Sequence, residues 1–110
     1  MKLIGSPFTI TDWSSIEPIA HSGECGIAYI RTQHLGELRI RMIEYSAGFL
    51  SDHWCSKGHI LHVIAGNLLI EYEDNAATSL TAGMTWHAAD GALPAHRVIC
   101  GSGASVLIVD

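Results

Sequence analysis

Charged residues are scarce in this sequence, and basic residues are the scarcest. Of its 110 residues, 6 are Lys or Arg and 11 are Asp or Glu, which gives a formal net charge of −5. A nucleic-acid-binding protein presents a basic patch or stripe to the phosphate backbone, and Arg31, Arg39 and Arg41 are too few to form one. We therefore expect no DNA or RNA partner.

Cysteines and long apolar runs are also few. The three cysteines, Cys25, Cys55 and Cys100, lie far apart. An odd number leaves one unpaired and suits a reducing compartment better than a disulfide framework, and we expect Cys25 and Cys100 to be small buried hydrophobic residues. No N-terminal apolar core has signal-peptide length, and no segment approaches the roughly 18 apolar residues of a membrane span. These absences predict a cytoplasmic protein without a membrane partner.

The length and the composition indicate one domain over residues 1–110. A chain of 110 residues is large enough to bury a core and too short for a second domain. Hydrophobic residues make up 48% of the sequence and charged residues only 15%, which excludes a disordered chain. This much apolar content leaves surface for a partner subunit, so we expect a homodimer.

The pattern of apolar residues predicts an all-β fold. No window has sustained helical periodicity, whereas short β-branched and aromatic runs recur about every eight to twelve residues between Gly, Asn and Asp. In residues 38–43 and 68–73, side chains alternate as in strands with one buried face. We expect about eight to eleven short strands, closed into a sandwich or barrel whose interior can hold one small ligand.

Three short segments predict the turns between these strands. Gly66-Asn67 and Asp74-Asn75 each lie between two apolar runs, at a spacing typical of a hairpin. Gly101-Ser102-Gly103 predicts a tight turn before a closing strand that runs to Asp110.

The run Ile60–Ile64 is apolar on both faces of a strand. Leu61 and Val63 would lie on one face, and Ile60 and Ile64 on the other. One face can pack into the core, so another segment must cover the second. The candidates are a second subunit and the N-terminal segment around Phe8, Ile10 and Trp13.

Possible metal ligands are concentrated between Gly48 and Gly66. His53 and Cys55 are two residues apart, so on an extended strand they leave the same face about 6 to 7 Å from each other. Residues 56–58 resemble a turn, after which His59 can return to the pair. Imidazole and thiolate together suit zinc, copper or ferrous iron and argue against magnesium or calcium. We therefore predict a divalent transition metal, zinc or iron first, with copper or nickel as alternatives.

This segment resembles the first motif of the cupins, which is Gly, His-x-His, Glu and Gly in a fixed frame. Gly48, His53, Cys55, His59 and Gly66 fall on that frame, one residue short after Gly48, with Cys55 at the second His position and His59 at the Glu position. The segment from Gly83 to His96 resembles the second cupin motif more loosely, with Ala89 where Pro is usual and the His displaced along the chain.

The block D-H-W-C-S-K-G-H, with D-W-S-S near the start and R-M-I-E-Y, is similar to the small DHCW-motif cupins over nearly the whole chain. The resemblance implies a double-stranded β-helix, or jelly-roll barrel, that is commonly dimeric and holds a metal inside. Carried over by position, the ligands are His53, Cys55, His59 and His96. Cys and His in place of the usual His and Glu make this set softer and remove the carboxylate, so the activity of better-known cupins does not carry over.

The other histidines and two nearby acidic residues have different expected positions or functions. His87 competes with His96 for the fourth ligand position, while His62 lies on the opposite strand face from His59. His21 and His34 have no partners nearby in sequence and are expected at the surface. An outer acceptor must orient a ligating imidazole, and Asp52, Glu44 or a backbone carbonyl can serve.

The sequence leaves the function open among several classes. A metal-binding cupin of unknown role is the first hypothesis. A metal-dependent dioxygenase or isomerase acting on a small polar molecule is an alternative, although no residue stands out as the catalytic base. A small-molecule or redox sensor, in which oxidation of Cys55 expels the ion, is another. The last is a structural dimer without metal, in which His53, Cys55 and His59 satisfy one another.

Overall fold

The computed structural model describes residues 8–110, which form nine strands and one short 3-10 helix. The all-β prediction and the predicted number of strands are confirmed. The elements are η1 (Trp13–Ser15), β1 (Ile19–Ser22), β2 (Ile27–Leu35), β3 (Leu38–Tyr45), β4 (Phe49–Leu50), β5 (His59–Tyr72), β6 (Ala77–Thr81), β7 (Thr85–Ala88), β8 (His96–Cys100) and β9 (Ala104–Val109). Residues 1–7, which entered the signal-peptide argument, lie outside the described part.

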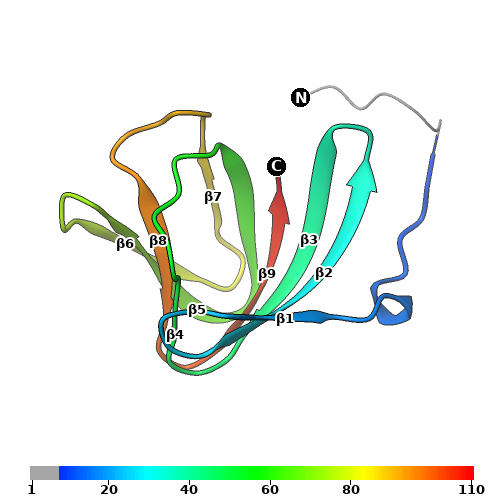
Figure 1. The fold of residues 1–110 in the computed structure, drawn as a ribbon, viewed down its shortest axis with the longest axis horizontal. Helices are drawn as coiled ribbons and strands as arrows, with labels where there is room; N and C mark the ends of the chain where they lie inside the picture. Colours follow the sequence, from blue (N-terminus) through cyan, green and yellow to red (C-terminus); the bar gives the residue numbers. More distant parts are fainter. Residues whose placement is uncertain (1–7) are drawn as a thin grey trace.

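The strands form one curled antiparallel sheet around β5. The order is β1-β2-β3-β9-β5-β8-β4, and β6 and β7 also pair with β5. The first half of β5 pairs with β7 and β9, and its second half pairs with β6 and β8. Figure 1 shows the resulting half-barrel, with β2 and β3 on one side and β4 and β8 on the other. One long strand therefore connects the two walls that face the interior.

The prediction of a hairpin at Gly66-Asn67 is wrong, because β5 continues through both residues without reversing direction. Gly66 has a φ of 77°, and the pairing of β5 with β9 shifts register between Val63 and Ala65. A Cβ on Gly66 would collide with the carbonyl oxygen of Gly103. Glycine here permits a bulge that bends one strand from one wall to the other, where a reversal was expected.

The two other predicted turns are confirmed. Asp74 and Asn75 join β5 to β6, with Asn75 at a φ of 71°. The side chain of Asp74 accepts a hydrogen bond of 3.0 Å from the backbone N–H of Ala76. Residues 101–103 connect β8 to the closing strand β9.

The buried faces of the strands follow the expected alternation. Leu61 and Val63 on β5 are 1% and 0% exposed, and Leu68 and Ile70 are equally buried. On β3 the buried face carries Ile43 and Tyr45, which leaves Glu44 exposed. Glu44 therefore does not enter the interior.

The two cysteines expected in the core differ from each other. Cys100 on β8 is fully buried, as predicted. The prediction for Cys25 is wrong, because Cys25 lies exposed between β1 and β2, where its backbone bridges to Leu50. Its segment is held by main-chain pairing at the rim and has no side-chain packing to bury the thiol.

The outer face of β5 stays apolar and exposed. Ile60 and Ile64 are 39% and 46% exposed, while Phe8 and Ile10 in the N-terminal segment are 90% and 95% exposed. That segment therefore does not cover the outer face, and coverage by a second subunit stays a prediction. Among residues 8–110, no helix is long and apolar enough to cross a membrane.

Candidate metal centre

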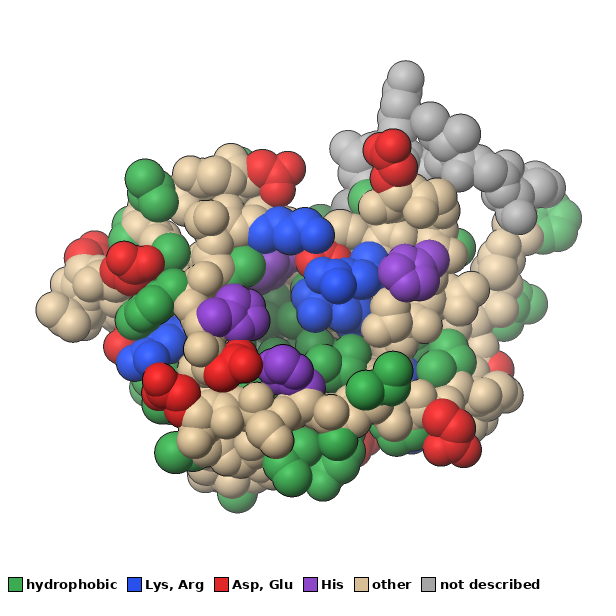
Figure 2. Space-filling view, in the orientation of Figure 1, with side chains coloured by type: hydrophobic (Ala, Val, Ile, Leu, Met, Phe, Trp, Pro, Cys, Tyr) green, Lys and Arg blue, Asp and Glu red, His purple; other side chains and the backbone are tan. Residues whose placement is uncertain are grey.

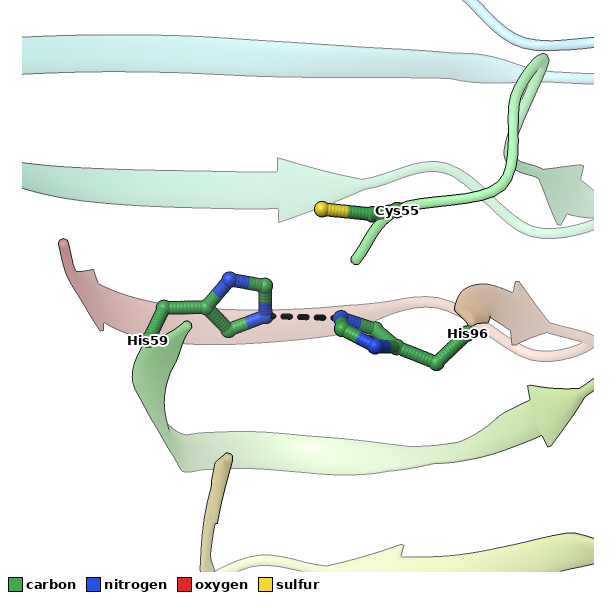
Figure 3. Close-up of side chains that lie close together, drawn as sticks. All are labelled: Cys55, His59 and His96. Carbon is green, nitrogen blue, oxygen red and sulfur yellow. Dashed lines mark hydrogen bonds between the residues drawn. The ribbon is translucent and has the colours of Figure 1, made fainter. Parts of the chain in front are cut away.

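Three of the four predicted ligands converge at one end of the half-barrel. The ligand atoms of Cys55, His59 and His96 all lie within 4.8 Å of one another. Cys55 comes from the β4–β5 loop, and His59 and His96 are the first residues of β5 and β8. Figure 3 shows the thiol and the two imidazoles pointing toward one another from these three segments.

Main-chain contacts place each of these side chains. Cys55 and His96 form an isolated antiparallel bridge, with backbone hydrogen bonds of 2.8 Å and 2.9 Å in the two directions. The backbone N–H of Gly58 donates to Oδ1 of Asp90 at 2.8 Å, and a side chain on Gly58 would collide with the backbone at Ala89 and Asp90. This close approach fixes the residue that precedes His59.

The two imidazoles contact each other and share one aromatic neighbour. Their Nε2 atoms are 3.1 Å apart, and the rings are nearly perpendicular. The Trp86 ring on β7 lies 5.4 Å from the His59 ring and 4.6 Å from the His96 ring, measured between centroids. Its indole N–H donates to the Tyr72 hydroxyl at 2.9 Å. No sequence motif includes Trp86, and the only signal for it is strand alternation, which puts it on the other face of the strand from its neighbour His87.

The competing histidines lie elsewhere. His87 is exposed on β7, outside the cluster. His62 lies on the other face of β5 from the buried Leu61 and Val63, and its Nδ1 is 2.8 Å from the Thr85 hydroxyl. The structure thus places His96 in the cluster and leaves His87 and His62 on outer faces.

His53 does not join the other three predicted ligands. The chain bends at residues 52–53, so the extended geometry assumed for His53 and Cys55 does not hold there. The His53 side chain is 70% exposed, and its Nδ1 lies 2.8 Å from an Asp52 oxygen. His53 still lines the cavity beside the cluster. Its role as a ligand stays a prediction.

His21 has a partner that its place in the sequence did not reveal. Its Nε2 lies 3.2 Å from the Asp52 carboxylate, and the residue lines the same cavity as His53. His21 lies at the surface, as expected, with its side chain 50% exposed, but it has a partner in Asp52 from a distant part of the sequence. Asp52 pairs with both histidines, and the pKa of its carboxyl is lowered by the hydrogen bonds with His53 and His21.

An ion-pair cluster around the buried carboxylate of Asp110 lies beside the site, and no sequence motif indicated it. The carboxylate of Asp110 is 1% exposed and accepts hydrogen bonds from Arg39 at 3.0 and 2.8 Å and from Arg41 at 3.3 Å. The Lys57 ammonium is 3.8 Å away. Burial raises the pKa of Asp110, but the Arg39 hydrogen bond and the three nearby cations outweigh it and lower the pKa overall. Alternation along β3 placed Arg41 on the face of Ile43, which was a signal for an inward arginine.

The electrostatics of the cluster favour neutral imidazoles. Burial lowers the pKa of His59 to about 4, with a further contribution from neighbouring His96. Burial also lowers the pKa of His96. The neutral ring is the form that binds a metal ion, so near pH 7 both histidines are ready to act as ligands.

The donor set fits a transition-metal ion. Two nitrogens bound tetrahedrally to zinc at about 2.05 Å are roughly 3.3 Å apart, and the two Nε2 atoms here are 3.1 Å apart. Mutual hydrogen bonding does not satisfy the cluster, because Nδ1 of His59 is buried and has no partner among the described residues. Three protein ligands leave a coordination position for another group.

That position borders a cavity of about 130 Å³. Its lining includes the three cluster residues and Arg41, together with apolar side chains that include Ile30, Ile43, Phe49 and Val98. Figure 2 looks onto a hollow in this face, with basic and histidine side chains around an apolar floor. The arrangement can hold an ion and a small molecule together.

Comparison with known proteins identifies the fold. No protein-family model matches the sequence, and no curated protein matches it. Among solved structures, a predicted oxalate decarboxylase from Thermotoga maritima is similar with a TM-score of 0.74 at 14% identity, covering 92% of this chain and 96% of that one. An RmlC-like cupin from Shewanella frigidimarina gives a TM-score of 0.71 at 15% identity, covering 98% and 92%.

A third structure is a sugar phosphate isomerase of the cupin superfamily from Silicibacter pomeroyi. It gives a TM-score of 0.73 at 16% identity and covers 92% of this chain and 74% of its own. At these identities the likeness shows the fold alone. The chain has the fold of the cupins, and within that fold its Cys55, His59 and His96 form a group that could hold a metal ion.

Proposed function

We propose that the protein is a metal-binding cupin of the DHCW-motif type, in which Cys55, His59 and His96 hold one divalent transition metal. The observation that carries the proposal is the convergence of three donors, from three separate segments, within 4.8 Å. Both imidazoles are neutral near pH 7, so they need no proton loss before they bind an ion. The thiol of Cys55 must ionise, and binding should therefore weaken in acid.

Zinc or iron is the ion that we propose. A thiolate and two imidazoles without a carboxylate form a borderline-soft set, which favours zinc and admits ferrous iron, copper or nickel. When bound, such an ion supplies Lewis acidity at its open position. The residues of the chain orient and shield it: the Cys55–His96 bridge fixes two ligands, and Trp86 covers both imidazole rings.

Metal analysis of protein purified without an affinity tag tests this proposal. We expect close to one zinc or iron per chain in the wild type. Cys55→Ser and His96→Ala should lose most of the metal while their far-UV circular dichroism stays unchanged. His87→Ala is the matched control, since His87 is an exposed histidine outside the cluster, and it should keep full stoichiometry. A wild-type protein that neither contains metal nor takes it up would contradict the proposal.

An enzyme is the second candidate, favoured by the open position beside a cavity. Sites with three protein ligands and one open position are typical of catalytic metals. A dioxygenase or isomerase acting on a small polar molecule is the corresponding activity. Oxygen consumption by the iron-loaded protein, surveyed with small hydroxy and keto acids, would test the dioxygenase. A Cys55→Ser control should abolish any turnover that depends on the metal.

We also propose that the protein is a cytoplasmic homodimer, as its composition and cysteine usage predict. The apolar side chains on the outer face of β5, Ile60 and Ile64, support the dimer because they are large and exposed.

A further inference from the structure

Arg41 lies in the interior with part of its guanidinium unpaired. The residue lines the cavity beside the metal cluster, and its side chain is 18% exposed. Its Nη2 makes one long hydrogen bond of 3.3 Å to Asp110, whereas its Nε is buried and has no partner among the described residues. The buried Nε cannot be reached from the cavity, but the exposed part of the guanidinium can donate to an acceptor that enters it.

The charges around Arg41 do not balance. Arg39 already binds the Asp110 carboxylate through two shorter hydrogen bonds, and Lys57 approaches the same carboxylate at 3.8 Å. Three cations thus share one anion. The other cavity-lining arginine, Arg97, also has a buried Nε without a partner among the described residues, but Glu71 and Glu24 pair with its charge and it stacks on Trp54. The excess positive charge at Arg41 favours an anionic ligand.

The cavity limits the size and character of this anion. Its volume of about 130 Å³ is a little below the roughly 150 Å³ of an engineered cavity that accepts benzene. Apolar side chains, Ile30, Ile43, Phe49 and Val98 among them, form part of its lining beside the charged and metal-binding residues. An inorganic ion such as phosphate would gain nothing from that lining. A ligand with one anionic end and a short apolar end suits both kinds of lining residue.

We propose that this cavity binds a small monocarboxylate with a short aliphatic chain, and that Arg41 holds its carboxylate next to the Cys55/His59/His96 cluster. The planar guanidinium offers parallel N–H donors that match a carboxylate. The inference concerns the same cavity as the proposed function, but it does not require a bound metal. Arg41 belongs to the chain whether or not an ion is bound.

Calorimetric titration of the whole protein with butyrate tests the inference. Wild type should bind butyrate, and Arg41→Gln should bind it about tenfold to hundredfold more weakly, because a charge-assisted contact is lost. Arg31→Gln is the matched control. It removes the same charge from the neighbouring strand β2, where Arg31 contacts the carbonyl oxygen of Ile16 and does not line the cavity. Its affinity should stay within about twofold of wild type. Arg41→Lys keeps the charge and should fall between wild type and Arg41→Gln.

Two further ligands separate charge from shape. Butyramide has the chain without the charge, and phosphate has the charge without the chain; both should bind at least about tenfold more weakly than butyrate. Equal affinity for butyrate and either ligand overturns the proposal, as does equal affinity in wild type and Arg41→Gln. If the far-UV circular dichroism shows that Arg41→Gln does not fold like the wild type, the proposal is tested instead by Arg41→Lys and by the wild-type affinities for butyramide and phosphate.

The same titration on metal-loaded and chelator-treated protein separates this inference from the metal proposal. Arg41-dependent binding of butyrate to a protein that never takes up metal supports the inference while the proposed function fails. A protein that holds one metal per chain but gives no heat with butyrate overturns the inference and leaves the metal site intact.

Discussion

Cys55 and His96 are hydrogen-bonded to each other through their main chains in both directions, at 2.8 and 2.9 Å. Residues that pair in this way across two antiparallel segments have their side chains on the same face and close together. The positions of the thiol and the imidazole are therefore set by backbone pairing, which does not need a bound ion. A metal at this site should stabilise a fold that already exists.

Removal of the metal should accordingly lower stability without unfolding the protein. After chelation we expect unchanged far-UV circular dichroism and a lower thermal midpoint. A free ion concentration about 100 times Kd adds roughly 2.7 kcal/mol to the free energy of unfolding. Scanning calorimetry with and without added zinc measures this difference, and Cys55→Ser should not show it. Loss of the β signature on chelation would mean that the ion organises the fold.

Trp86 should report occupation of the site. Its ring lies 4.6 and 5.4 Å from the two ligand imidazoles, whereas Trp54 stacks with Arg97. Coordination of the histidines changes the charge next to the indole, so zinc titration should alter tryptophan emission. The change should persist in Trp54→Phe and vanish in Trp86→Phe. A response that Trp86→Phe leaves unchanged would contradict His59 and His96 as ligands.

Asp110 should make stability depend on pH. Because its folded-state pKa lies below the ordinary value of 3.8, the charged carboxylate stabilises the fold fully above that value, and this contribution is lost as the pH falls through the folded-state pKa. Asp110→Asn should cost about 2 to 3 kcal/mol at neutral pH, since it leaves the arginines without their anion. Urea unfolding at a series of pH values measures the cost.

The difference between wild type and Asp110→Asn should shrink as the pH falls below the ordinary carboxyl value of 3.8 and through the lower folded-state pKa, because the wild-type carboxyl becomes neutral as well. Glu37→Gln is a control, since Glu37 is exposed in the β2–β3 turn, and it should change stability little at any pH. A cost for Asp110→Asn that does not vary with pH would show that charge is not the cause.

The local pattern of the sequence was enough to predict the strands, the Asp74-Asn75 turn and the proximity of Cys55 and His59, whereas His96 entered the predicted ligand set through the resemblance to the cupins. Strand alternation and ligand spacing are local properties, and here the tertiary structure follows them. The bend at residues 52–53 is the local exception, because it separates His53 from Cys55.

Features that depend on which strands become neighbours could not be predicted. Asp110 meets Arg39 and Arg41 because β9 pairs with β3, which no local pattern specifies. His21 meets Asp52 for a similar reason, across a long sequence separation. Gly66 was ambiguous in another way: a hairpin turn and a bulge both use a glycine with positive φ, and only the approach of Gly103 distinguishes them.

The close approach of the Gly103 backbone predicts that Gly66→Ala strongly lowers the free energy of unfolding. Gly48 serves as its matched control, because both glycines have a φ near 78° but a Cβ on Gly48 would meet nothing within 4 Å. Gly48→Ala should cost about 1 kcal/mol of unfolding free energy through its backbone conformation alone. Gly66→Ala adds a collision with the Gly103 backbone and should cost at least about 2 kcal/mol more. Equal costs in urea unfolding would remove the close approach as the reason for this glycine.

The outer face of β5 should lie in the interface of the predicted homodimer. Ile60 and Ile64 are 39% and 46% exposed there, and the N-terminal segment does not cover them. A charge buried in an apolar interface is costly, so Ile64→Glu should convert the dimer to a monomer. Light scattering coupled to size exclusion measures the mass. Leu93→Glu is the control, because Leu93 is 82% exposed in the β7–β8 loop and away from this strand. A wild-type monomer, or a dimer that Ile64→Glu leaves intact, would place the interface elsewhere or remove it.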